Sequence, residues 1–156
     1  MGKAIPLKTN WLVALLFVSL CTHAQLTEIK PSGDWELLGQ VKYVGPAKAS
    51  LEYQAGTNDT TYLLLMRDSR YELKEYFSVR FKGEGGTLNN LFELLISFFT
   101  KENRKNKDYS KLFYLGDKKV FVQHFKQLTG HQVMLSTDDG RILFTEGEVK
   151  RLFNRK

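Results

Sequence analysis

The chain has 156 residues, of which 23 are basic and 17 acidic, and its formal net charge is +6. This length suits one domain with a core large enough to fold unaided, so we expect one domain rather than several. The only cysteine is Cys21, which excludes a disulfide within the chain and leaves packing as the source of stability.

The first 24 residues predict an export signal. Residues 1–10 contain Lys3 and Lys8 but no acidic residue, and residues 11–21 form an apolar, uncharged run. Residues 22–24, Thr-His-Ala, have the small-x-small character of a cleavage site. We therefore expect cleavage between Ala24 and Gln25 and a secreted or periplasmic protein.

Two alternatives to a cleaved signal remain open. One is an uncleaved membrane anchor, although the apolar run is shorter than the ~20 residues that a membrane span needs. The other is a lipoprotein anchored at Cys21, although the preceding Leu20 is bulkier than the residue usual at that position. Cleavage at Ala24 would leave a cysteine-free mature chain without a transmembrane helix, and its 21 basic and 17 acidic residues would give a charge of +4.

The first half of the mature chain predicts a lead-in segment and four strands. Residues 25–34 show no hydrophobic period, and a single α+β domain is expected over residues 35–156. Alternation of apolar and polar residues predicts strands at 35–43, 50–54 and 76–82. Residues 61–66 are apolar on both faces of the expected strand, which predicts a central strand that is covered on each side.

A helix is predicted over residues 88–99, after a glycine-rich turn and with Thr87 as its cap. Its apolar residues recur at helical spacing, and Leu94 and Phe98 widen the stripe beyond what one sheet face would cover. We therefore expect these two residues to contact a partner or a second copy; the alternative is that the lead-in segment or the last helix covers them. Residues 101–107 follow as an exposed basic loop, in which Arg104, Lys105 and Lys107 are further candidate partner-binding residues.

The second half predicts two hairpins and a closing helix. Strands are expected at residues 112–115, 120–125, 131–137 and 141–144, with glycine-containing turns inside each pair. Thr145 and Glu148 match a capping box at the start of the last helix. The fold class is therefore α+β: one mostly antiparallel sheet of about eight strands with two helices, in the order ββββα-ββββα. The two halves share this plan, and whether they arose by duplication stays open.

Three groups of side chains are candidates for chemistry. His124 and His131 lie on neighbouring predicted strands, but the sequence offers no third metal ligand at suitable spacing. Two acidic side chains held close together can catalyse glycoside hydrolysis, and six acidic residues are candidates: Glu84, Glu93, Asp138, Asp139, Glu146 and Glu148. Turn and cap positions account for most of them. Basic residues cluster at 101–107, 118–119 and 150–156. We therefore predict no catalytic residue, no metal ligand and no cofactor.

The layout of a short export signal and a small cysteine-free domain resembles that of many bacterial envelope proteins. The leading hypothesis is a noncatalytic binding or assembly module of the bacterial envelope, with an unknown protein partner or self-association. One alternative is a carboxylate-dependent hydrolase of envelope glycans, and another is a polyanion-binding domain. Nucleic acid is not an expected partner, because the protein is predicted to be exported.

Overall fold

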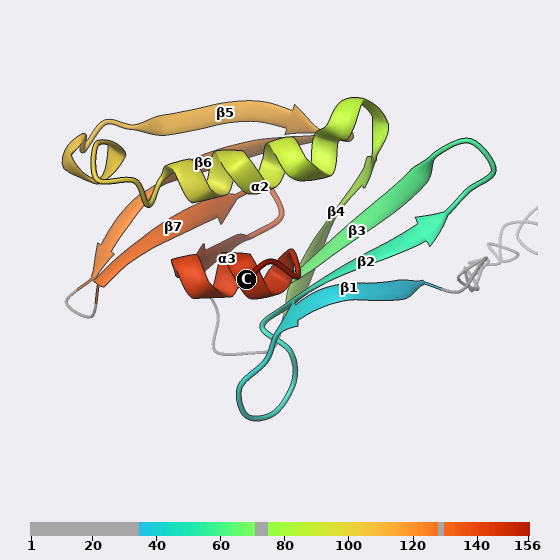
Figure 1. The fold of residues 1–156 in the computed structure, drawn as a ribbon. Helices are drawn as coiled ribbons and strands as arrows, with labels where there is room; N and C mark the ends of the chain where they lie inside the picture. The colour runs from blue at the N-terminus through green and yellow to red at the C-terminus, as the bar shows by residue number, and fades with distance from the viewer. Residues whose placement is uncertain (1–34, 71–74, 128–129) are drawn as a thin grey trace, which may run out of the picture. The chain divides into compact units, whose positions relative to one another are not determined.

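The computed structural model describes residues 35–70, 75–127 and 130–156, so the predicted signal (1–24) and lead-in segment (25–34) lie outside the described residues. The described chain forms two antiparallel four-stranded meanders, each followed by a helix (Figure 1). This confirms the α+β class and agrees with the order ββββα-ββββα. No helix in the described ranges is long and apolar enough to cross a membrane.

The observed elements match the predicted ones to within a few residues. The first meander and its helix are β1 (Glu36–Val41), β2 (Ala49–Ala55), β3 (Thr60–Arg67), β4 (Tyr76–Lys82) and α2 (Thr87–Ser97). The second set is β5 (Ser110–Leu115), β6 (Lys118–Gln127), β7 (Gly130–Ser136), β8 (Arg141–Phe144) and α3 (Glu146–Leu152). Short 3₁₀ turns occur at Glu84–Gly86 and Asn103–Lys105.

The prediction of one eight-stranded sheet is wrong, because the strands form two separate sheets with the orders β1-β2-β3-β4 and β5-β6-β7-β8. Every ladder joins strands that are neighbours in sequence. The turn after β4 and the helix α2 separate β4 from β5 along the chain, and no ladder joins these two strands. The sheets approach each other where β4 lies near β5 and β3 near β8.

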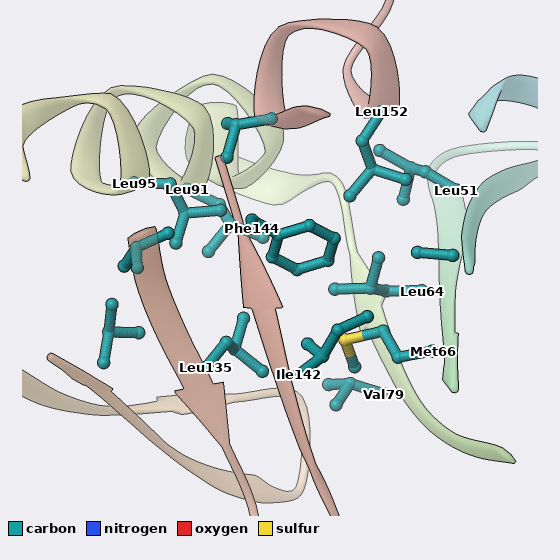
Figure 2. Packing of buried hydrophobic residues seen from close by; sticks show 14 of the residues in the cluster. Leu51, Leu64, Met66, Val79, Leu91, Leu95, Leu135, Ile142, Phe144 and Leu152 are labelled. Carbon is teal, nitrogen blue, oxygen red and sulfur yellow. The ribbon is translucent and has the colours of Figure 1, made fainter. Parts of the chain in front are cut away.

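Both sheets contribute to one hydrophobic core. In β4, Phe77, Val79 and Phe81 are buried and the residues between them are exposed, as the alternation predicts. Figure 2 shows how side chains from both sheets and both helices converge, and the labelled residues include Leu64 of β3, Phe144 of β8 and Leu95 of α2. The core therefore unites the two meanders.

The prediction that β3 is covered equally on both faces is not met. Leu64 and Met66 are buried in the core, whereas Leu63, on the opposite face, is only half-buried. Leu63 stands in register between Glu52 and Arg80, so this face carries a polar row. Strand β3 is internal in its sheet, but only one of its faces belongs to the core.

Helix α2 begins differently from the prediction. Its N-cap is Gly86, which has a left-handed backbone (φ 74°), and no side chain caps the helix. Thr87 is the first helical residue, and its hydroxyl donates to the carbonyl of Glu84 instead. Glycine is favoured at such a position because a side chain would strain the left-handed conformation.

Helix α3 begins with the predicted capping box. The amide of Glu148 donates to the Thr145 hydroxyl (3.3 Å), and the amide of Thr145 donates to Glu148 Oε2 (2.7 Å). The Glu148 side chain is 3% exposed and also accepts from Lys48 Nζ (2.7 Å) and the Tyr43 hydroxyl (3.0 Å). The cap therefore joins α3 to the loop between β1 and β2.

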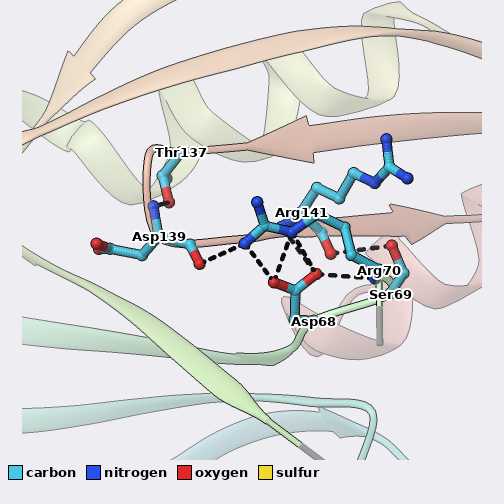
Figure 3. Close-up of polar contacts among 6 residues, drawn as sticks. All are labelled: Asp68, Ser69, Arg70, Thr137, Asp139 and Arg141. Carbon is cyan, nitrogen blue, oxygen red and sulfur yellow. Dashed lines mark hydrogen bonds and ion pairs between the residues drawn. The ribbon is translucent and has the colours of Figure 1, made fainter. Parts of the chain in front are cut away.

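A polar clamp joins the end of β3 to the β7–β8 turn (Figure 3). The buried carboxylate of Asp68 accepts from Arg70 Nη2 (2.6 Å), and the same guanidinium nitrogen donates to the Asp139 carbonyl (2.7 Å). Ser69 adds two hydrogen bonds to the Arg141 carbonyl, from its amide (2.8 Å) and its hydroxyl (3.0 Å). Burial alone would raise the pKa of Asp68, but hydrogen bonds from Arg70 and Arg141 hold it below its ordinary value.

Candidate anion-binding site

The core-facing side of the second sheet becomes polar toward one end of β6. Val122 is fully buried on this side, and His124 and Lys126 follow it at the two-residue spacing that keeps side chains on one face. His131 of β7 stands directly opposite Lys126 in the ladder. The two histidines therefore lie on neighbouring strands and share the core-facing side.

The segment after α2 lies against this polar end and is fixed to it. The Nε2 atom of His124 is 3.0 Å from the carbonyl oxygen of Asn103, whose own side-chain amide donates to the Ser97 carbonyl (2.7 Å). The rings of Phe98 and Tyr109 lie 5.2 and 6.0 Å from the His124 ring, measured between centroids. These contacts hold the basic loop over the end of the second sheet.

Between the loop and the sheet lies a pocket of about 460 Å³, in which every charged residue is basic. Its lining consists of Arg104, Lys105, Asn106, Lys107, His124, Lys126 and His131. Comparison of the chain with family models, curated proteins and solved structures finds no match. We therefore infer a function from the chemistry of this basic pocket.

The basic pocket combines residues that the sequence had suggested separately. Arg104, Lys105 and Lys107 were predicted to bind a partner, and His124 was considered with His131 as a histidine pair and by itself as a catalytic group of the hydrolase alternative. Lys126 was not among the predicted site residues. Its alternation with His124 in the same strand was the signal that could have identified it.

Positive charge in the basic pocket is only partly neutralised. Lys105, Lys107 and Lys126 form no ion pair within the described part of the chain. Arg104 approaches one carboxylate, that of Glu146, at 3.7 Å. Since like charges confined in one concave region repel one another, a bound anion would relieve this repulsion.

The surroundings of His124 disfavour its charged form. Burial lowers the pKa of His124, the Asn103 carbonyl partly opposes this effect, and His131 and Arg104 lower the pKa further. The described residues contain no group of three or more His, Cys, Asp or Glu side chains that could hold a metal ion. The arrangement is suited to anions rather than to cations.

The two apolar residues predicted to bind a partner lie in different environments. Phe98 is fully buried, and its ring meets that of Tyr109 edge-on at 4.7 Å, so it supports the basic pocket from within the core. Leu94 is half-buried and packs against the core. It also lines a shallow groove of about 230 Å³ between α2 and β5, with Phe113 and Tyr114. Leu94 is thus the more accessible of the pair.

Four of the six acidic residues considered for catalysis lie in separate ion pairs within the described chain: Glu84, Asp139, Glu146 and Glu148. Asp139 pairs with Lys118 at 2.9 Å, and Glu146 pairs with Lys150 at 3.0 Å. Glu148 is buried against Lys48, as described above. Each of these contacts has a structural role, and the first two also neutralise part of the basic clusters at residues 118–119 and 150–156.

Proposed function

We propose that this protein is an exported, noncatalytic binding module of the bacterial envelope whose ligand is anionic. The observation that carries the proposal is the basic pocket, where four cationic side chains and two histidines face one cavity without an acidic residue in the lining. The volume of about 460 Å³ falls within the range of about 300–1,000 Å³ typical of small-molecule sites.

The attraction between the basic pocket and an anion would be electrostatic. A unit positive charge ~5 Å from a unit negative charge contributes ~0.8 kcal/mol even at the dielectric constant of water, and more where water is partly excluded. Several such charges act together on one anion, which makes multiply charged groups such as sulfate or phosphate better ligands than a single carboxylate. The three lysines without ion pairs need not break an existing pair to bind the ligand.

The polyanion alternative predicts the same basic residues but a larger ligand. A sulfated glycan would place one charged group in the basic pocket and further groups on the surrounding surface. Binding of a heparin tetrasaccharide much more tightly than inorganic sulfate would favour this alternative. The hydrolase alternative stays a prediction. The carboxylates that form ion pairs with lysines, described above, lend it no support.

The test of anion binding is a nuclear magnetic resonance titration of the purified protein with sodium sulfate at low ionic strength. Weak binding is measurable in this way, and low salt limits the screening of exposed charges. The wild-type protein should show saturable shifts at residues of the basic pocket. The double variant Lys105→Gln/Lys107→Gln should bind about tenfold more weakly, because ~0.8 kcal/mol or more is lost for each lysine.

A matched control removes two positive charges elsewhere. Lys42 and Lys119 are exposed residues outside the basic pocket, and Lys119 stands opposite Tyr114 on the outer side of the second sheet. Lys42→Gln/Lys119→Gln should retain binding within about twofold. Equal weakening in both double variants would show that net charge, rather than the basic pocket, attracts the anion, and would overturn the proposal.

A further inference from the structure

The histidines in the basic pocket can change its charge near neutral pH. An unperturbed histidine has a pKa of about 6.5, so it titrates where lysine and arginine keep their charge. His124 and His131 share one face of neighbouring strands and line the same cavity. Protonation of His124 would therefore add one positive charge to the four that Arg104 and the three lysines already provide.

The hydrogen bond of His124 determines which nitrogen titrates. The Asn103 carbonyl oxygen can only accept, so Nε2 must carry the hydrogen when the imidazole is neutral. The proton gained on acidification then binds at Nδ1. Because the contact from Nε2 to Asn103 is kept in both states, titration changes the charge of the basic pocket without releasing the loop.

Charged and titratable groups surround His124 on several elements. The loop contributes Arg104, Lys105 and Lys107, strand β6 contributes Lys126, and strand β7 contributes His131. Toward β5, Tyr109 lies beside the His124 ring and Lys111 Nζ lies 5.0 Å from the Tyr109 ring centroid. From α3, Glu146 reaches Arg104. This environment is mainly cationic, which opposes protonation of an empty site.

We propose that the basic pocket takes up a proton on His124 when it binds an anion, so that anion binding strengthens as the pH falls. This inference rests on the proposed function, because it requires that an anion bind there. A bound anion replaces repulsion among the cations by attraction, and it therefore favours protonated His124. Without an anion, burial and the neighbouring cations lower the pKa of His124, so a bound anion can raise this pKa.

The sign and size of the effect follow from linkage. If the anion raises a histidine pKa, affinity is highest below the pKa of the free protein and declines until the pH exceeds the pKa of the complex. The total change in dissociation constant is tenfold for each pH unit by which the pKa rises.

The experiment follows the imidazole proton resonances from about pH 5 to pH 8, with and without sulfate, and measures the sulfate dissociation constant at both ends. Sulfate is the probe because its own charge is constant over this range. We expect sulfate to raise the pKa of His124 by about one pH unit or more, and affinity to be about tenfold higher at the acidic end.

Two variants test whether His124 titrates. His124→Gln keeps a side-chain amide that can donate to the Asn103 carbonyl, so this variant should fold. It should lose the pH dependence of sulfate binding, whereas Lys119→Gln should keep it. Thermal unfolding of each variant checks that the fold is retained.

The outcomes separate the two proposals. If wild-type protein binds sulfate equally well at both pH values without a change in histidine pKa, proton uptake is refuted and anion binding stands. If sulfate binds at neither pH, both proposals fail. If His124→Gln keeps the pH dependence, another group takes up the proton and the assignment to His124 is wrong.

Discussion

Replacing Glu148 by alanine removes the centre of the polar cluster that joins α3 to the β1–β2 loop. The Glu148 carboxylate is 3% exposed and accepts hydrogen bonds from Lys48, Tyr43 and the Thr145 amide. Alanine cannot replace any of these bonds. The change therefore leaves a partly buried cation and a helix-terminal amide without their acceptor.

The expected loss of stability is about 3–4 kcal/mol. Removing one partner of a buried ion pair costs about 3–5 kcal/mol, and the lower value applies because Lys48 is 26% exposed and can reach water. Loss of the acceptor for the Thr145 amide adds about 1 kcal/mol. Tyr43 adds little, because its side chain is largely exposed. In a domain of this size the midpoint of thermal unfolding should fall by about 10 °C or more.

The assay is urea unfolding followed by circular dichroism, and the matched control is Glu146→Ala. Glu146 lies in the first turn of the same helix, but its ion pair with Lys150 is exposed, so we expect a loss within about 0.5 kcal/mol. If Glu148→Ala were no more destabilising than Glu146→Ala, the buried cluster would not anchor α3, and the reasoning would be refuted.

The same cluster predicts a pH dependence of stability. Burial alone would raise the pKa of Glu148, but Lys48, the Thr145 amide and Tyr43 outweigh it and hold the pKa below its ordinary value. Because the pKa of Glu148 is lower in the folded state than in the unfolded state, ionised Glu148 stabilises the fold. This contribution is complete above the unfolded-state pKa of about 4.3 and is lost as the pH falls through the folded-state pKa. In Lys48→Met the folded-state pKa should rise toward the unfolded value, so the loss of stability that this carboxyl group causes on acidification should become smaller. An unchanged pH dependence of stability in that variant would contradict this assignment.

Two further predictions concern the β7–β8 turn and the export signal. A Cβ atom on Gly140 would lie 2.3 Å from the Phe77 ring, so Gly140→Ala should lower the free energy of unfolding by about 1–3 kcal/mol in urea titrations, whereas Gly147→Ala, with open space around it, should not destabilise the protein. Mass spectrometry of the exported protein should show a chain that begins at Gln25, and a lipid on Cys21 or an intact first residue would contradict cleavage.

Local structure was predictable because short-range patterns determine it. The alternation in β4 identified its buried residues, and the spacing of Thr145 and Glu148 identified the start of α3. Both signals depend on residues that are close in sequence. Gly140 shows a limit of this approach: the hairpin was predicted from its turn residues, but its close approach to Phe77 depends on a residue more than sixty positions away.

The division into two sheets was not predictable from the same patterns. Alternation shows which residues of a strand share a face, but it does not show which strands pair across α2. The apolar stripe of α2 was equally ambiguous, since a partner, a second copy or another part of the chain would satisfy it. In the structure, Phe92 meets Phe153 of the C-terminal segment at 5.5 Å between ring centroids, and Phe98 is buried in the core, so much of the stripe packs within the chain.

The basic pocket also depends on contacts between residues that are far apart in sequence. Its loop is basic and its strand alternates, and each property alone is typical of solvent-exposed structure. The contact between His124 and the Asn103 carbonyl, 21 residues apart, places the loop over the end of β6. Phe98, the C-cap residue of α2, packs its ring against that of His124, and the loop that follows borders the side of the sheet that carries His124 and Lys126. Positive charge is thereby concentrated at the polar end of a core-facing surface, which is the property on which the proposed anion binding and its proposed dependence on pH both rest.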